Sequence, residues 1–459
     1  MKQILLTVAI ALIASASFAQ KGNITAKEMS KVKAHFTKDA QTKALQNAII
    51  NHKDLRSMAE NFENAGKIDH LFKYRVKVNG ITNQKSSGRC WMFTSMNVLR
   101  PRVIEKYDLS NFDFSHNYLY FWDIFEKSNL FLENIIATAN KPMDDREVVT
   151  YFKDPASDGG VWNSFYNLAI KYGVVPQSVM PETQHSNNTR QMVSHIKRKL
   201  REAGYEIREM AANGKKEKNL RAYKVEALGS VYRILAFCLG EPPVNFTWRY
   251  KNSKKEIKSI TTTPMDFFKG IVPTDYTSEN YIMVMNDPTR EYYKVYEIKN
   301  YRNTMEGVNW TYLNLPNDEI KTASLKSIKN NEALYTSSDV GKQFNRKQGI
   351  MDVNNYDYES LFGVKFGMDK KARILTRDSG SAHAMALIGC DTDDNDQPTK
   401  WEFENSWGRH GNNGYETFTD KWFDEYIFRV VIHKKYMSPK AVKALKGKKI
   451  MLPVWDYMF

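Results

Sequence analysis

The chemistry of this sequence is best sought at its cysteines, because its 459 residues include only three. Cys90 stands in the stretch "NQKSSGRCWMF", directly before a tryptophan and six residues after Gln84. A thiol is a strong nucleophile once it loses its proton, but its ordinary pKa of about 8.5 leaves little thiolate at neutral pH. Cys90 is therefore either a small buried residue at the start of a helix or a nucleophile that other groups activate.

Three devices could activate a thiol at this position, and the sequence holds a candidate for each. A helix that begins at Cys90 would direct the positive end of its dipole at the sulfur. A histidine can take the thiol proton, and a polar group can then fix the orientation of the imidazole. His383, in "SGSAHAMALIGCD", lies at the mouth of an apolar strand, and Asn405, in "ENSWG", ends the next strand. Asn405 could accept the imidazole N–H, with Trp407 shielding that bond from water.

Each of these residues also has an ordinary structural interpretation. A histidine beside an apolar strand is commonly a core residue, and an asparagine at a strand end is commonly a turn former. Cys238 and Cys390 lie in apolar runs and are interpreted as core cysteines. An odd number of cysteines leaves at least one unpaired, and the joint occurrence of Cys90, His383 and Asn405 favours a catalytic site.

The elements that must position these residues follow from hydrophobic periodicity. "FKYRVKVNGI" alternates like a strand and leads to Gln84, and a helix is expected from Cys90 with Pro101 limiting it. Basic helices are expected between residues 187 and 235, and strands between 243 and 335. "HAMALIGCD" and "TKWEFENSWG" predict neighbouring strands on either side of the polar turn "TDDNDQP". The sequence therefore predicts an α+β fold.

Composition and charge bound the class of protein. Hydrophobic residues make up 42% of the chain and charged residues 26%, as in ordinary globular proteins. The formal net charge of +15 permits attraction to nucleic acid or acidic partners, although a lysine-rich solvated surface gives the same balance. No HExxH or CxxC pair and no glycine-rich phosphate loop is present, so no metal or other cofactor is expected.

Residues 1–19 have the pattern of a secretory signal peptide. Lys2 supplies the charged end, Ile4 to Ile13 the apolar stretch, and residues 17–19 a small-x-small cleavage site. The apolar run is shorter than the roughly 20 residues that a membrane helix needs. The mature protein is therefore expected to begin near Gln20, to be exported to the periplasm or the medium, and to have no membrane anchor.

In chain order, "QKSSGRCWMF", "SDGG", "SAHAMALIG" and "ENSWG" resemble the motifs of papain-like cysteine peptidases. The first of these motifs is most similar to that of the bleomycin hydrolase/aminopeptidase C branch. The same branch is also resembled by "GEPPVNFTW", "NDP", "DVGKQFN" and "LPVWD", so the resemblance runs from about residue 70 onward. The resemblance implies Cys90 as the nucleophile, His383 as the base and Asn405 as the orienting amide. It also implies Gln84 as the side chain of the oxyanion hole, where its amide N–H would stabilise a tetrahedral intermediate.

The resemblance extends to fold and assembly. It implies a papain-like fold of two subdomains, one helical and one β-barrel-like, with substrate backbone lying along Gly159 and Gly160. About 290 residues separate Cys90 from His383, against roughly 130–150 in simple papains, and the surplus resembles an insertion that this branch uses for subunit contacts. A homohexamer is therefore implied. The C-terminal tail of the branch lies in the cleft, which would place the Phe459 carboxylate opposite the amino group of the substrate.

These inferences predict a thiol-dependent aminopeptidase that cleaves peptides through an acyl-enzyme. Because the tail ends a few residues sooner than is usual, an endopeptidase or an exopeptidase that releases short peptides is the alternative. The expected organisation is a signal peptide (1–19), an N-terminal helical lead (20–70), a helical subdomain with the nucleophile (71–190), an insertion (191–335), a β-rich subdomain with the histidine and asparagine (336–440) and a tail (441–459).

Functions of other classes stay open from the sequence alone. A basic protein could bind nucleic acid without sequence preference, an inactive scaffold could share the fold, and a transamidase could share the Cys–His pair. Export makes nucleic acid less accessible to this chain. The set of Gln84, Cys90, His383 and Asn405 opposes an inactive scaffold, and the Gln-to-Cys spacing together with the Asn partner favours a peptidase.

Overall fold

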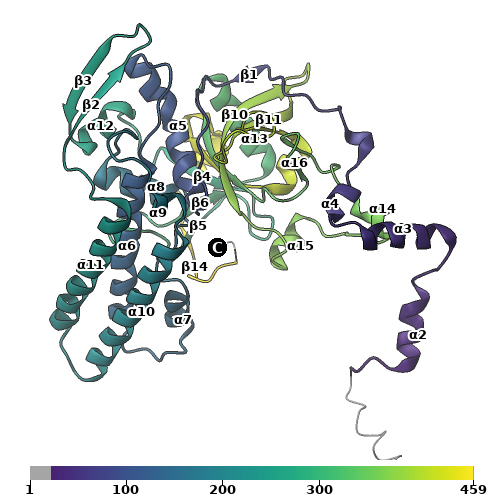
Figure 1. The fold of residues 1–459 in the computed structure, drawn as a ribbon, viewed down its shortest axis with the longest axis horizontal. Coiled ribbons are helices and arrows are strands. Elements are labelled where there is room, and N and C mark those ends of the chain that lie inside the picture. Colours follow the sequence, from purple (N-terminus) through teal and green to yellow (C-terminus); the bar gives the residue numbers. More distant parts are fainter. Residues whose placement is uncertain (1–21, 458–459) are drawn as a thin grey trace, which may run out of the picture. The chain divides into compact units, whose positions relative to one another are not determined.

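The computed structural model describes residues 22–457, which divide into two compact units (Figure 1). The smaller unit takes in the described residues up to Glu60 together with Asp357–Gly363. It contains α2 (Ala26–Ala34), α3 (Ala40–Asn51), α4 (Leu55–Met58) and α14 (Tyr358–Phe362). The expected signal peptide, residues 1–19, lies outside the described residues.

The helices of the smaller unit begin at capping residues. Thr25 accepts a hydrogen bond from the Glu28 N–H, and the Glu28 carboxylate accepts from the Thr25 N–H, which forms a capping box before α2. Asp39 accepts from the Thr42 N–H at the start of α3. Neither α2 nor α3 buries a residue, so local capping rather than core packing defines where these helices start.

The larger unit takes in the described residues of Asn61–Tyr356 and Val364–Phe459 and combines a helical part with one large sheet. Its helices are η1 (Phe62–Asn64), α5 (Cys90–Tyr107), α6 (His116–Ala137), α7 (Arg146–Lys153), α8 (Trp162–Tyr172), α9 (Gln184–Asn187), α10 (Arg190–Ala212), α11 (Glu217–Leu239), α12 (Pro264–Ile271), α13 (Asn317–Lys329), α15 (Lys370–Leu375), α16 (Asp420–Tyr426), η2 (Lys434–Tyr436) and α17 (Pro439–Ala444). Its strands are β1 (Tyr74–Arg75), β2 (Phe246–Lys251), β3 (Ile257–Thr262), β4 (Tyr281–Met285), β5 (Lys294–Ile298), β6 (Thr311–Asn314), β7 (Leu334–Ser338), β8 (Phe344–Asn345), β9 (Ile350–Met351), β10 (His383–Thr392), β11 (Pro398–Glu404), β12 (Tyr415–Thr419), β13 (Ile427–His433) and β14 (Ile450–Leu452).

The large sheet is mixed and has the strand order β14-β5-β6-β4-β13-β7-β10-β11-β12-β9-β8, with β1 beside β10. β10 pairs antiparallel with both β7 and β11, and its first eight residues are all buried. The strand that begins with His383 therefore lies inside the sheet, where its position is well determined. β2 and β3 form a separate hairpin.

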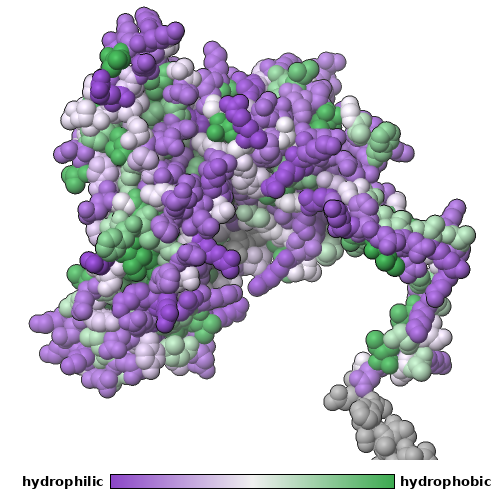
Figure 2. Space-filling model, in the orientation of Figure 1, coloured by the Kyte–Doolittle hydropathy of each residue, from purple (hydrophilic) through white to green (hydrophobic). Residues whose placement is uncertain are grey.

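Several expected elements are found. "HAMALIGCD" and "TKWEFENSWG" form the neighbouring strands β10 and β11, and the basic segments form α10 and α11. Figure 2 shows mostly hydrophilic side chains over the part of α10 and α11 that is in view. The strands β4, β5 and β6, which fall within the range expected as an insertion, belong to the same sheet as β10.

The expectation that Pro101 limits the helix from Cys90 is wrong, because α5 continues to Tyr107. A proline inside a helix removes one backbone hydrogen bond and crowds the preceding turn. Here Leu99 and Val103 are buried on either side of it, so packing into the core outweighs the local cost. α5 ends instead at Tyr107, followed by the C-cap residue Asp108, whose backbone is left-handed with φ of 52°. In Figure 1, α5 lies between the helical part and the sheet.

No helix within residues 22–457 is both long enough and apolar enough to cross a bilayer.

Candidate active site

Cys90 is the first residue of α5, at the point where this helix meets β10. Cys90 is half-buried. The backbone amide of Ala384, the residue that follows His383, hydrogen-bonds the sulfur and acts to lower the pKa of the thiol. The fold therefore brings the head of the helix and the start of the histidine strand to the same sulfur, although about 290 residues separate them in sequence.

His383 and Asn405 are hydrogen-bonded, with 2.8 Å between His383 Nε2 and Asn405 Oδ1. The orientation of the Asn405 amide is fixed on both sides, because Oδ1 also accepts from the Ser406 N–H and Nδ2 donates to Glu416 Oε1. An amide oxygen only accepts, so the imidazole must carry its proton on Nε2. The lone pair of Nδ1 is then free to receive a proton.

The Trp407 ring lies against the His383 imidazole. The ring centroids of His383 and Trp407 are 4.4 Å apart, and His383 is only 6% exposed. The Arg346 guanidinium lies over the Trp407 ring, 4.6 Å from its centroid. Excluding water strengthens the His383–Asn405 bond, because a hydrogen bond in a low-dielectric site has little competition from solvent.

Burial disfavours a charge on either member of the Cys90–His383 pair. It raises the pKa of the Cys90 thiol, an effect larger than that of the Ala384 amide, and it lowers the pKa of His383 to about 4. Neither group therefore charges alone at neutral pH. A proton transfer from Sγ to Nδ1 creates both charges at once, and each then offsets the desolvation of the other. The helix dipole at Cys90 favours the anion.

Gln84 is held by its own hydrogen bonds beside the first turn of α5. Its Oε1 accepts from the Ser406 hydroxyl at 2.7 Å, and its Nε2 donates to the Ser87 carbonyl at 2.7 Å. The Gln84 backbone N–H also donates to the Ser406 carbonyl. Only 5% of Gln84 is exposed, so its amide is rigid. Nε2 keeps a second N–H for an oxyanion.

Gly159 and Gly160 lie in a loop that is tied to the helical part. A Cβ on Gly160 would stand 2.7 Å from the Trp91 ring, so this position excludes any side chain for packing reasons. The Gly159 carbonyl accepts from Lys127 Nζ at 2.6 Å. A Cβ on Gly159 would meet only the Ser157 hydroxyl, at 3.8 Å, so Gly159 is glycine without a steric demand from the protein itself.

A cavity of 760 Å³ runs beside these glycines, and the C-terminal tail forms part of its wall. Gly159 and Gly160 line it together with the segment 454–457. β14 pairs in parallel with β5, and beyond it Arg290 pairs with Asp456 and stacks on the Tyr457 ring. The tail is therefore anchored up to Tyr457 in the cavity that Gly159 and Gly160 line. Phe459, the predicted terminal carboxylate, lies outside the described residues.

The model of the Peptidase C1-like family matches residues 23–459. Aminopeptidase C of Lactobacillus delbrueckii subsp. lactis is 38% identical over 400 residues, covering 85% of this chain and 88% of that protein. Bleomycin hydrolase of Homo sapiens is 36% identical over 431 residues, covering 92% and 94%. The crystal structure of PepW from Lactobacillus rhamnosis HN001 matches with a TM-score of 0.91 at 35% identity, covering 96% and 99%.

The chain belongs to the Peptidase C1-like family. The resemblance drawn from the motifs and the papain-like α+β fold are thereby confirmed. In this member of the family the structure brings together Cys90, His383, Asn405, Trp407 and Gln84 around the junction of α5 with the sheet. Within residues 22–457, no cluster of histidine, cysteine and carboxylate side chains has the arrangement of a metal site.

Sequence reasoning missed three residues that support the site of this Peptidase C1-like chain. Ser406 links Gln84 to the Asn405 segment through its hydroxyl; its place in "ENSWG" was the available signal. Asp158 accepts from the Gly88 N–H at 2.7 Å, and its carbonyl accepts from the Trp91 indole at 2.8 Å. Lys127, on α6, has no local motif that would have identified it.

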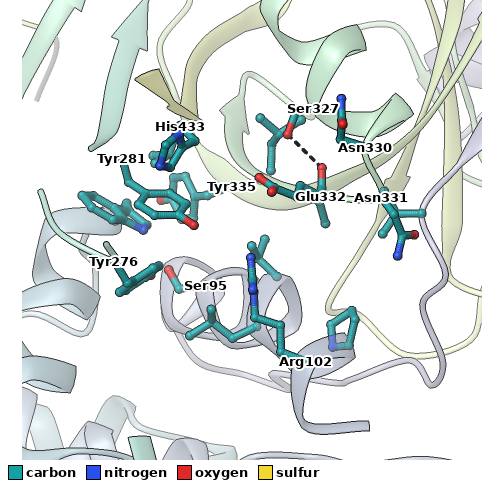
Figure 3. A pocket seen from close by; sticks show the side chains of 18 of the residues that line it. Ser95, Arg102, Tyr276, Tyr281, Ser327, Asn330, Asn331, Glu332, Tyr335 and His433 are labelled. Carbon is teal, nitrogen blue, oxygen red and sulfur yellow. Dashed lines mark hydrogen bonds between the residues drawn. The ribbon is translucent and has the colours of Figure 1, made fainter. Parts of the chain in front are cut away.

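A second hollow of 230 Å³ lies between α5 and the sheet (Figure 3). Arg102 projects into it from α5, and the Ser327 hydroxyl donates to the Glu332 carbonyl at its edge. Its polar wall also includes Ser95, Tyr276, Tyr281, Asn330, Asn331, Tyr335 and His433. None of the predicted site residues lines this pocket, so it is separate from the peptidase site.

Proposed function

We propose that this chain is a thiol-dependent aminopeptidase that is acylated at Cys90. The observation that carries the proposal is the fixed imidazole of His383, whose Nε2 is bound to Asn405 while the Ala384 amide reaches the Cys90 sulfur. The chain is a cysteine peptidase, and relatives that are 38% and 36% identical over most of its length are named aminopeptidase C and bleomycin hydrolase.

The chemistry divides into two steps around this pair. Cys90 Sγ attacks the scissile carbonyl as its proton passes to His383 Nδ1. The tetrahedral oxyanion receives N–H groups from the Cys90 backbone and from Gln84 Nε2. His383 then gives its proton to the leaving amine, which expels the new N-terminus and leaves a thioester. In the second step His383 takes a proton from water, which hydrolyses the thioester and frees Cys90.

The anchored tail supports an exopeptidase rather than an endopeptidase. The tail lines the cavity from Val454 to Tyr457, and it is held by β14 and by the Arg290–Asp456 pair. We infer that the Phe459 carboxylate receives the free amino group of the substrate at the closed end of the cleft. The alternative is that the short tail leaves room for peptides or for internal cleavage.

Assembly and export are further parts of the proposal. Large apolar side chains stand exposed along the expected insertion, with Val225 66%, Phe237 75% and Val244 84% exposed. These side chains are available for subunit contacts, and the resemblance of this region to an insertion that makes such contacts favours a homohexamer. Sedimentation velocity should therefore give a mass well above 53.2 kDa, and an expressed full-length chain should be found outside the cytoplasm without residues 1–19.

The test compares aminoacyl and N-blocked peptide substrates under reducing conditions. Wild-type protein should release N-terminal residues from free peptides and leave blocked peptides intact. A chain that ends at Tyr457 keeps the Asp456 anchor but withdraws the terminal carboxylate by two residues, and it should cleave blocked or longer peptides. Unchanged products would overturn the role of the tail while leaving the thiol peptidase intact. Full activity of Cys90→Ala would overturn the thiol mechanism itself.

A further inference from the structure

Glu416, on β12, is a buried carboxylate directly behind the Asn405 amide. It is 0% exposed, and its Oε1 accepts from Asn405 Nδ2 at 3.3 Å. The same oxygen lies 2.7 Å from His410 Nε2, although the ring is not aligned for a linear hydrogen bond. Within the described chain, Glu416 Oε2 has no hydrogen-bond partner. Burying a carboxylate with so few hydrogen-bond partners costs folding free energy. A functional role for the Glu416 charge would explain why the fold bears this cost.

Polar and charged groups from several segments surround Glu416. β11 contributes Asn405, and the loop between β11 and β12 contributes His410, whose Nδ1 lies 3.1 Å from the Gly408 carbonyl. In the turn between β8 and β9, a Cβ on Gly349 would stand 3.2 Å from Glu416 Oε2. Two further charged or titratable groups face the cluster. They are His70, whose Nδ1 lies 2.6 Å from the Thr417 hydroxyl, and Arg346, which acts electrostatically on His410.

The Asn405 amide joins this carboxylate to the imidazole. Its N–H side faces Glu416 Oε1 at 3.3 Å, and its oxygen faces His383 Nε2 at 2.8 Å. A carboxylate that accepts an amide N–H polarises the amide and makes its oxygen a stronger acceptor, because hydrogen bonds in a chain strengthen one another. An imidazole N–H donates more strongly when the ring is an imidazolium. The negative charge of Glu416 therefore favours protonated His383 over the neutral ring.

We propose that Glu416 is a positioning residue that stabilises the His383 imidazolium through Asn405, with His410 as its counter-cation. This inference rests on the proposed function, in which His383 holds the Cys90 proton during acylation. It also explains how the site bears an imidazolium that burial opposes. The amide orients the ring, as in other cysteine peptidases, and in this chain a buried carboxylate adds its charge behind the amide.

His410 supports the pairing from the other side. Its contact with Glu416 raises the pKa of His410 above its ordinary value, which outweighs the lowering by burial. The His410 cation is therefore kept to a higher pH than in an exposed histidine. The His410 cation thus compensates the buried charge of Glu416. The Glu416 carboxylate still accepts the hydrogen bond from Asn405, so it can stabilise the His383 imidazolium through that amide.

The test is the pH profile of kcat/KM for an aminoacyl substrate, comparing wild type with Glu416→Gln. Glutamine keeps the shape and the oxygen that accepts from Asn405 but removes the charge. The alkaline limb, where imidazolium is lost, should move to lower pH by at least half a unit. The maximum of kcat/KM should fall about tenfold, the loss expected when a charge-assisted contact becomes neutral.

Glu402→Gln is the matched control. Glu402 lies on the neighbouring strand β11, is 3% exposed, and pairs with Arg75 outside this network. It should lower stability without moving the alkaline limb. If Glu416→Gln lowers activity equally at every pH, with a profile parallel to that of wild type, Glu416 is structural only and the proposal is overturned.

Two further measurements keep the outcome decisive. Should Glu416→Gln not fold, Glu416→Met has similar length and no polar group to bury, and the same shift of the alkaline limb is expected of it. The rate of Cys90 alkylation by iodoacetamide, measured as a function of pH, reports the Cys90–His383 pair without substrate turnover. The alkaline part of this rate profile should shift in the Glu416 variant as the alkaline limb of kcat/KM does. Failure of the proposed function is recognised separately, because Cys90→Ala would then retain activity whatever the Glu416 variants do.

Discussion

The two halves of the site are built by different means. On the helical half, Cys90 is placed by backbone: it begins α5, and the loop beside it is tied by Lys127 and Asp158 to neighbouring carbonyl and N–H groups. On the sheet half, His383 is placed by a chain of side chains that runs through Asn405 to Glu416. Changes on the first half should therefore affect attack and substrate binding, whereas changes on the second should affect proton transfer and its pH dependence.

The two halves share one hydrophobic core, and two polar side-chain contacts also join them beside Asn405. Ser406 connects the asparagine segment to Gln84, and Glu404 of β11 forms a buried ion pair with Arg100 of α5 at 2.5 Å. Both connections lie next to Asn405 in sequence. These two contacts tie the segment that carries Asn405 to the helical half.

The largest effect is expected on the helical half, from Cys90→Ala. Removing the nucleophile should lower kcat by at least about 10³-fold, because the loss of one residue of a catalytic group costs nearly as much activity as the loss of the whole group. Cys238→Ala is the control, since Cys238 is a partly exposed thiol on α11 that lies outside the site. Initial rates on an aminoacyl substrate measure both. Comparable activity of the two variants would show that Cys90 is not the nucleophile.

On the sheet half, Asn405→Ala should have the next largest effect. The imidazole loses the acceptor that fixes Nε2–H, so its Nδ1 is presented to Cys90 only part of the time, and kcat should fall about 10²-fold with KM little changed. Asn395→Ala, in the exposed turn between β10 and β11, is a matched substitution outside the site. A drop confined to KM would indicate that Asn405 contacts substrate rather than the imidazole.

The chemical residues could be predicted from sequence because their motifs are short and local. Cys90 follows its glutamine closely, and Asn405 stands beside Trp407 in one pentapeptide. Glu416 and His410 could not be predicted, since an alternating strand gives no sign of which buried carboxylate faces an amide on its neighbour. Pro101 led to a wrong prediction for the opposite reason. Proline locally disfavours a continuing helix, but the packing of α5 residues on both sides of Pro101 keeps the helix intact.

A smaller effect is expected from Lys127→Met, which tests whether the loop on the helical half positions substrate. Lys127 donates to the carbonyls of Ser157 and Gly159 and pairs with buried Asp123. Its loss should loosen the glycine loop and raise KM several-fold with little change in kcat. The control is Lys197→Met, which removes an exposed ion pair to Asp154 of the same loop, because exposed pairs contribute little. Equal effects of the two variants would contradict the assignment.

The smallest effect on catalysis, but a distinct one on stability, is expected from Glu404→Gln at the junction of the halves. Burial raises the pKa of Glu404 to about 7, against an ordinary value of 4.5, despite the opposing effect of Arg100. The folded protein then binds more protons than the unfolded chain between pH 4.5 and 7. The free energy of unfolding must therefore fall as pH rises through that window, by up to about 3 kcal/mol for this group.

Glutamine does not titrate, so Glu404→Gln should flatten this part of the stability curve, as measured by urea unfolding at pH 5 and pH 8. Glu63→Gln, at an exposed position, should leave the slope unchanged. A slope that persists in Glu404→Gln would mean that the Arg100 pair keeps Glu404 ionised throughout. In that case the junction would be held by a full buried ion pair, and breaking it would misalign Asn405 with Cys90 at every pH rather than only above pH 7.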